Sequence, residues 1–149
     1  MGRLAREGAK TPLASFLSRT GVAGVPGEAP LSDNARALCG LVRHLVRYQT
    51  EDPETLVGLE ALMWLGAGDC DDVAIALGAL LLRCGVPLRW AVGWQDGRAA
   101  HVWVQANAGD GWIDLDPSTY RVEPGTSPMR LGELDYLTTH DLNGKRYRA

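Results

Sequence analysis

An α+β fold is predicted for this sequence, with helices in the first part of the chain and an antiparallel β-sheet in the second. Before Pro87, apolar residues recur at helical spacing; after it, short segments rich in Val, Trp and Ile are separated by glycine-containing turns. The length of 149 residues and the 46% hydrophobic composition fit one domain with an ordinary core. We expect the helices to pack against a meander sheet.

Residues 1–30 differ in character from the rest of the chain. They are rich in Gly, Pro, Ala and Ser, and residues 21–30 show no hydrophobic periodicity. We therefore expect a flexible N-terminal arm over residues 1–30 and one folded domain over residues 31–149.

Two helices are expected in the first half of the folded domain. The first covers residues 33–48, where apolar residues recur every three or four positions. The second begins at Asp52-Pro53, a good cap and first-turn pair, and runs to Glu60 or Trp64. The Gly66-Ala-Gly68 bend ends it.

A third, mostly buried helix is expected to begin at Cys70. The apolar run Val73–Leu82 follows this cysteine, and Gly85 and Pro87 provide the end of the helix. This placement puts Cys70 at a helix N-terminus.

Three strands are expected after Pro87, at residues 88–95, 99–106 and 112–116, because they alternate in polarity between the turns Asp96-Gly97 and Gly109–Gly111. The tail is less regular. Residues 117–128 are typical of a loop, and Asn143-Gly144 indicates a final hairpin between residues 136 and 148.

Charge and hydropathy limit the classes of partner. With 15 basic and 18 acidic residues the net charge is -3, which gives no attraction to nucleic acid or to an anionic membrane. The run Val73–Leu82 stops at Arg83 and is too short for a membrane span, which needs about 20 apolar residues. We expect a cytoplasmic protein that acts on a peptide or other small amide substrate.

The three cysteines, Cys39, Cys70 and Cys84, are an odd number without paired spacing, which argues against a disulfide framework and against a zinc site. Cys39 and Cys84 lie in apolar helical segments and are interpreted as packing residues. Adjacent acids at a helix start cannot all converge on one ion, so Asp69, Asp71 and Asp72 are interpreted as capping groups. No metal or cofactor is expected.

Cys70 is the cysteine placed to act as a nucleophile. Unpaired N–H groups at a helix N-terminus favour a thiolate, whereas the neighbouring aspartates oppose it. A cationic partner is therefore needed.

His101 is the candidate for that partner. It opens an alternating strand segment, so its imidazole should lie on the same face as Trp103 and Gln105. On the next strand Asp114 and Asp116 share a face, and either could accept the second imidazole N–H. His140 lies in the irregular tail and receives no role. Nor does His44, which we place with Arg43, Arg47 and Tyr48 on the solvent side of its helix.

Three motifs in this order resemble the transglutaminase-like superfamily, relatives of papain-type cysteine proteases. They are Gly-Asp-Cys70-Asp-Asp at the start of an apolar helix, His101-x-Trp103 on a strand, and Gly-Trp-Ile-Asp-Leu-Asp116-Pro-Ser after it. The resemblance covers residues 65–119, and the short Gly-Asp-Cys-Asp-Asp form is similar to bacterial and phage-encoded members. It implies that Cys70 is the nucleophile, His101 the base and Asp116 the orienting acid, with Asp114 as the weaker candidate.

The resemblance implies a catalytic domain that acts as a thiol hydrolase of peptide or amide bonds through an acyl-enzyme. Two alternatives stay open: an acyltransferase that accepts an amine, and a non-catalytic structural or binding module that retains the fold. The oxyanion would be held by the Cys70 N–H and one upstream donor, for which Tyr48, Gln49 and Trp64 are candidates. Trp103 would shield the His–Asp hydrogen bond, and Asp72 would hydrogen-bond within the active-site wall.

Overall fold

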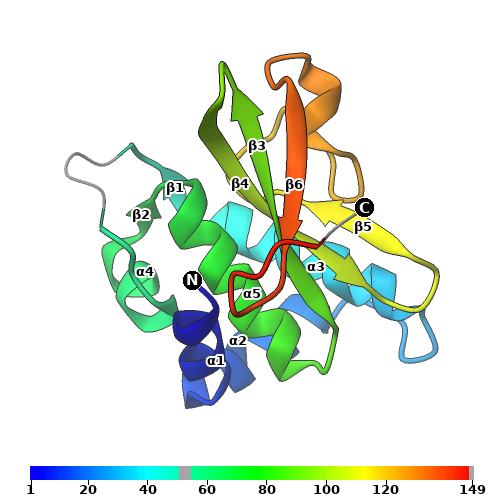
Figure 1. The fold of residues 1–149 in the computed structure, drawn as a ribbon. Coiled ribbons are helices and arrows are strands. Elements are labelled where there is room, and N and C mark those ends of the chain that lie inside the picture. Colours follow the sequence, from blue (N-terminus) through cyan, green and yellow to red (C-terminus); the bar gives the residue numbers. More distant parts are fainter. Residues whose placement is uncertain (51–54, 148–149) are drawn as a thin grey trace.

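The computed structural model describes residues 1–50 and 55–147. Helices α1 to α5 lie mainly on one side of the molecule and an antiparallel sheet lies on the other (Figure 1). This arrangement confirms the α+β prediction. The elements are α1 (Gly2–Ala9), α2 (Pro12–Val22), α3 (Leu31–Leu45), β1 (Arg47–Tyr48), α4 (Leu59–Leu65), β2 (Ala67–Gly68), α5 (Cys70–Arg83), β3 (Leu88–Gln95), β4 (Arg98–Asn107), β5 (Trp112–Leu115), the 3-10 helix η1 (Pro128–Leu131) and β6 (Tyr136–His140).

Helix α5 occupies the centre of the molecule. Every residue from Asp72 to Leu81 is buried, because the other four helices and strand β4 all contact this helix. Gly85 takes a φ of 71° just past its end, and the Val86 N–H returns to the Leu81 carbonyl at 3.0 Å, which confirms the predicted glycine stop. Although α5 is largely apolar, the described part of the chain holds no helix long and apolar enough to cross a membrane.

The sheet has the strand order β5-β4-β3-β6, with antiparallel pairing throughout. Asp96 and Gly97, with φ of 50° and 72°, form the tight turn between β3 and β4 that their sequence predicts. The chain also turns near Asn143-Gly144, and a single bridge joins Arg146 to His140. The main partner of β6, however, is β3, so the tail completes the sheet.

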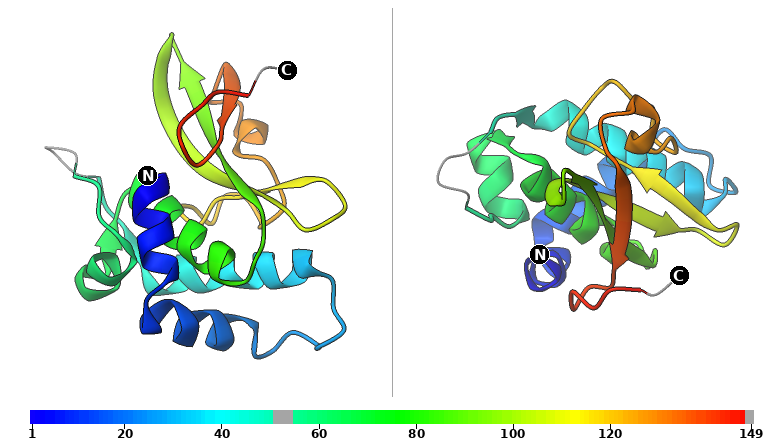
Figure 2. Two further views of the ribbon diagram at one scale, coloured as in Figure 1. Left: turned by 60° about the horizontal axis from the view of Figure 1, so that its bottom comes forward. Right: turned by 45° about the horizontal axis from the view of Figure 1, so that its top comes forward.

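The prediction of a flexible arm over residues 1–30 is wrong for most of that segment, because α1 and α2 are packed helices (Figure 2). Thr11 caps α2 by accepting the Ala14 N–H at 3.1 Å, and Ala5 and Leu17 join the core. A Cβ on Gly8 would come within 3.1 Å of the Ala79 side chain on α5. The small residues that resembled a linker therefore allow close helix packing.

Two boundaries also differ from the prediction. The helix expected over residues 33–48 spans Leu31–Leu45, and Arg47 and Tyr48 instead form β1, which pairs in parallel with β2. The expected cap Asp52-Pro53 lies outside the described residues, and the helix described after it begins only at Leu59. The β1–β2 pair places Tyr48 beside Gly68, two residues before Cys70.

We predict that Gly78→Val lowers the free energy of unfolding by about 1–3 kcal/mol, the usual cost of overpacking a core. A Cβ at Gly78 would lie 2.8 Å from the Trp90 ring and 3.4 Å from the Ala5 side chain, where α5 meets β3 and α1. Urea unfolding measures the effect. Gly40→Ala is the control, because its added Cβ would meet no atom within 4 Å apart from the backbone of its own helix and its chain neighbours. It should stabilise the helix by about 0.5–1 kcal/mol. Equal stability of Gly78→Val and the unmodified protein would contradict the packing described here.

Candidate active site

Cys70 is the first residue of α5, and a capping box fixes the position of the helix start. The Asp69 carboxylate accepts hydrogen bonds from the N–H groups of Asp71 at 3.1 Å and Asp72 at 3.4 Å, and the Asp72 carboxylate accepts the Asp69 N–H at 3.3 Å. The Cys70 Sγ also lies 3.8 Å from Asp71 Oδ1. The aspartates thus cap the helix, as their positions predict.

Asp72 is buried behind the site. Its second oxygen accepts the Val57 N–H at 3.0 Å, so this carboxylate joins the segment before α4 to the start of α5. Its predicted hydrogen bonding is present, but Asp72 lines neither cleft around His101. It supports the nucleophile position from the scaffold side.

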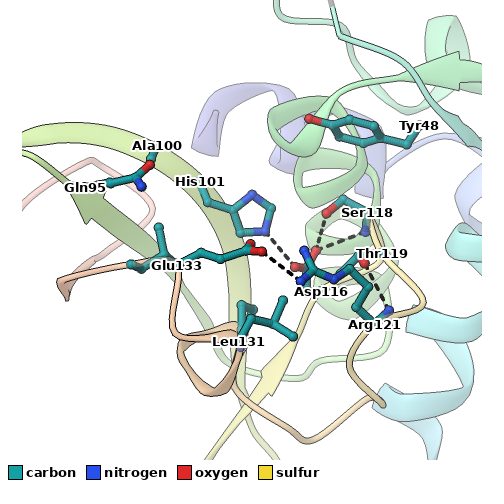
Figure 3. Close-up of a pocket in the computed structure, with 12 residues that line it drawn as sticks. Tyr48, Gln95, Ala100, His101, Asp116, Ser118, Thr119, Arg121, Leu131 and Glu133 are labelled. Carbon is teal, nitrogen blue, oxygen red and sulfur yellow. Dashed lines mark hydrogen bonds and ion pairs between the residues drawn. The ribbon is translucent and has the colours of Figure 1, made fainter.

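His101 on β4 is hydrogen-bonded to Asp116, which directly follows β5. The distance from His101 Nε2 to Asp116 Oδ2 is 2.6 Å (Figure 3). The other oxygen of Asp116 accepts the Ser118 N–H at 3.0 Å and the Ser118 hydroxyl at 2.6 Å, and the carboxylate is fully buried. Of the two candidate aspartates, Asp116 is therefore the partner of His101.

The surroundings of His101 favour its protonated form. Burial is the largest single influence and disfavours the charge, but the hydrogen bonds to Asp116 and Cys70, together with the negative charges of both groups, raise the pKa of His101 to about 10. Since Asp116 occupies Nε2, Nδ1 is the nitrogen left for Cys70. The structure thus brings together Cys70, His101 and Asp116.

Asp114 binds a different pair of side chains on β4. Its Oδ1 accepts hydrogen bonds from Trp103 Nε1 at 2.5 Å and from Gln105 Nε2 at 2.8 Å. Gln105 lies directly opposite Asp114 in the β4–β5 register, and Trp103 stacks against His101 with ring centroids 5.8 Å apart. His101, Trp103 and Gln105 therefore share a face, as the alternation predicts.

Two clefts meet at His101. One, of about 430 Å³, is lined by Cys70, Asp69 and Asp71; the other, of about 300 Å³, is lined by Asp116 and Ser118. Tyr48 and Ala100 line both clefts with His101. Ala100 is the extra residue of a β-bulge, because Gly93 pairs with His101 whereas Trp94 pairs with Ala99.

Of the three upstream residues considered as oxyanion donors, only Tyr48 reaches these clefts. Burial, and then the negative charges of Cys70 and the neighbouring aspartates, raise the pKa of Tyr48, so its hydroxyl keeps its proton. Gln49 is exposed, and the Trp64 side chain is 90% exposed on α4. As far as the described residues go, the linings of both clefts include neither of them.

Arg43 and the Arg121–Glu133 pair belong to the site and were missed by sequence reasoning. Arg43 is only 6% exposed, which corrects its assignment to the solvent side of α3. Its Nη2 donates to the carbonyls of Asp116 at 2.7 Å and Val122 at 2.9 Å, so it holds the turn after β5. Arg121 and Glu133 form a 2.8 Å ion pair on the wall of the smaller cleft (Figure 3). No sequence pattern distinguishes these charges from ordinary surface residues.

Within the part of the chain that the structure describes, the other two cysteines form no second centre. Cys39 is buried in the core, which raises its pKa to about 12, and Cys84 packs against the core at the end of α5. Over residues 1–50 and 55–147, no three His, Cys, Asp or Glu side chains are grouped so that they could hold a metal ion.

A family model and several solved structures are similar to this chain. A family model described as the transglutaminase-like superfamily matches residues 19–117, which confirms the resemblance drawn from the three motifs. The chain is similar to a protein of Cytophaga hutchinsonii named provisionally as a cysteine protease, with 21% identity and a TM-score of 0.58 over 81% of this chain and 40% of that one. No curated protein matches the chain.

Two further solved structures show the same fold. A provisionally named protease of Parabacteroides distasonis shares 12% identity, with a TM-score of 0.65 over 98% of this chain and 29% of that one. A protein named as a TGase shares 14% identity, with a TM-score of 0.58 over 77% of this chain and 33% of that one. The chain spans less than half the length of each of these relatives.

We predict that the His101 imidazole stays protonated until the pH approaches about 10. Asp116→Asn should lower the pKa of His101 toward the ordinary value of 6.5, because the charge that stabilises the imidazolium is lost. A nitrogen-detected NMR titration of histidine-labelled protein measures both values. Asp110→Asn removes the same charge from the exposed β4–β5 turn and should leave the titration unchanged. A His101 that titrates near 6.5 in the unmodified protein would contradict the described hydrogen bonds.

Proposed function

Because this chain belongs to the transglutaminase-like superfamily, we propose that it is a cysteine-dependent acyl-transfer enzyme, a thiol hydrolase of peptide or amide bonds with Cys70, His101 and Asp116 as its triad. The observation that carries the proposal is the position of His101. Its Nε2 is bound by a buried carboxylate at 2.6 Å, and its imidazole lines the same cleft as Cys70. The three side chains thus offer a nucleophile, a base beside it and a carboxylate that orients the base.

In the resting state proposed here, the proton shared by Cys70 and His101 lies on the imidazole. The raised pKa of His101 makes the imidazolium the stable form at neutral pH. The Cys70 thiolate attacks the substrate carbonyl, and the Nδ1–H of His101 protonates the departing amine. Asp116 keeps the imidazole oriented and stabilises its charge throughout.

The second half of the reaction releases the acyl group. Neutral His101, having given up its proton, accepts one from a water molecule, and the resulting hydroxide attacks the thioester. The acid leaves, and the thiolate–imidazolium pair is restored. We propose a reducing compartment such as the cytoplasm for this chemistry, because Cys70 is a free, partly exposed thiol that oxidation would inactivate.

Two hydrogen-bond donors are proposed for the tetrahedral oxyanion. The first is the Cys70 N–H, since the capping box uses the N–H groups of Asp69, Asp71 and Asp72 but not this one. The second is the Tyr48 hydroxyl, which lines both clefts beside His101 and is held there by the β1–β2 pairing. The capping box positions the first donor, and the β1–β2 pairing positions the backbone that carries the second.

The proposed function predicts that iodoacetamide labels Cys70 at neutral pH at a rate that depends on His101. His101→Ala should lower the labelling rate at least about tenfold, because the imidazolium that stabilises the thiolate is gone. Peptide mapping by mass spectrometry assigns the label, and Cys84 serves as the internal control because it is partly exposed but has no histidine partner in the described structure.

Turnover of a fluorogenic peptide library by the full chain accompanies this measurement, with Cys70→Ala as the inactive reference. Release of an amine that Cys70→Ala abolishes supports the hydrolase. The proposal would be contradicted if Cys70 were labelled as slowly as Cys84 and if His101→Ala left the labelling rate of Cys70 unchanged.

We predict that Tyr48→Phe lowers kcat by about 10²–10³ with little change in KM, as expected for the loss of one oxyanion donor. The phenyl ring retains the cleft wall, so only the hydroxyl is removed. Steady-state kinetics on the best library peptide measure the effect. Tyr136→Phe is the control and should leave kcat unchanged. Tyr136 lies on β6, at the opposite edge of the sheet from β5, and its ring stacks on Trp94. An equal kcat for Tyr48→Phe and the unmodified enzyme would assign the second donor elsewhere.

A further inference from the structure

We propose that Asp114 is a positioning residue for His101 and that it acts through Trp103, whose indole it locks against the imidazole ring. The inference deepens the proposed function and rests on it for the catalytic role of His101. By strand alternation Asp114 lies on the same face as Asp116, two residues later in the chain. Among the described contacts, however, Asp114 touches neither His101 nor the clefts.

Trp103 connects Asp114 to His101. Its side chain is fully buried, and its ring stacks against the imidazole at 5.8 Å between centroids and 29° between planes. Its one polar atom, Nε1, donates to Asp114 Oδ1. A buried indole N–H needs an acceptor, so this bond selects the orientation of the ring within the core.

The acceptor is itself held in place by a chain of side chains along the sheet. Gln105 Nε2 donates to the same Asp114 oxygen at 2.8 Å, and Gln105 Oε1 accepts from Arg89 Nε at 2.8 Å. The Arg89 guanidinium lies 4.2 Å above the Trp112 ring, a cation–π contact that fixes its position. Arg89 thus orients the Gln105 amide, and the Gln105 amide and Trp103 together fix Asp114.

The consequence for His101 is geometric. Trp103 forms a rigid wall on one face of the imidazole, and a ring confined in this way keeps Nε2 directed at Asp116 and Nδ1 at Cys70. The negative charge of Asp114 is not what acts on His101, because the groups that raise the pKa of His101 are Asp116 and Cys70. An uncharged acceptor at position 114 should therefore serve nearly as well.

The test compares two uncharged variants of the full chain. Asp114→Asn keeps an acceptor for Trp103 and Gln105, whereas Asp114→Ala removes it. Asp114→Ala should lower the His101 pKa in an NMR titration by about one unit or more and slow iodoacetamide labelling of Cys70 at pH 7 about tenfold or more. Asp114→Asn should stay within about twofold of the unmodified rate, as should Asp110→Ala, which removes a carboxylate from the adjoining exposed turn.

Trp103→Phe provides a second route if Asp114→Ala does not fold, since it keeps an aromatic ring but lacks the N–H. It should show the same shift and slowing, and the double variant should be no worse than either single one. A folded Asp114→Ala or Trp103→Phe protein with an unchanged His101 titration overturns the inference, as does an Asp114→Asn protein as impaired as Asp114→Ala. The titration needs no turnover, so it decides this inference even if the unmodified protein cleaves no peptide and the proposed function fails.

Discussion

The burial of α5 is the constraint on which the rest of the structure depends. A helix enclosed by four others and by β4 has little freedom to shift, because each of its apolar side chains fills space against a different neighbour. Its first residue, Cys70, nevertheless reaches a cleft, since the capping box ends the helix where the packing ends. The position of Cys70 relative to His101 is therefore set by the contact of α5 with β4 and not by the loops around the site.

The acid side of the site is fixed in a second way, by hydrogen bonds to the Asp116 carboxylate and to its backbone carbonyl. Asp116 is buried, and a buried carboxylate is costly unless each oxygen has a partner. His101 binds one oxygen and Ser118 the other. From the helical side, the buried Arg43 binds the backbone carbonyl of the same residue, and the Tyr120 hydroxyl donates to the Arg43 carbonyl at 3.1 Å. The carboxylate and its backbone are thus held independently, which restricts the His101–Asp116 geometry from both ends.

Local signals predicted the parts of the fold that depend on neighbouring residues. Asp69 as a helix cap, Gly85 as a helix end and the Asp96-Gly97 turn each follow from the conformations that those residues favour. The three motifs also predicted the superfamily, which the family model over residues 19–117 confirms.

What the sequence did not predict depends on distant partners. Helices α1 and α2 bury mainly small residues, among them Ala5, Gly8 and Ala14, so the composition of their segment resembled that of a linker. A long basic side chain on a helix is usually solvated. Arg43 is buried because it donates to the backbone carbonyl of Asp116, a residue 73 positions later in the chain. Pairing of β6 with β3 is likewise a contact between segments that no local pattern joins.

Asp114 and Asp116 show how two residues that are equivalent by strand periodicity acquire different surroundings. Asp114 lies inside β5, opposite Gln105, and its carboxylate is restricted to the side chains across the ladder. Asp116 lies one residue beyond the end of the strand, where no ladder bond holds the backbone. The chain turns there at Pro117, which allows Ser118 to fold back onto the carboxylate and directs its other oxygen toward His101. The difference therefore arises from where the strand ends, a boundary that the alternating pattern places only to within a residue or two. Because β5 stops at Leu115, one acid remains part of the sheet and the other faces the imidazole.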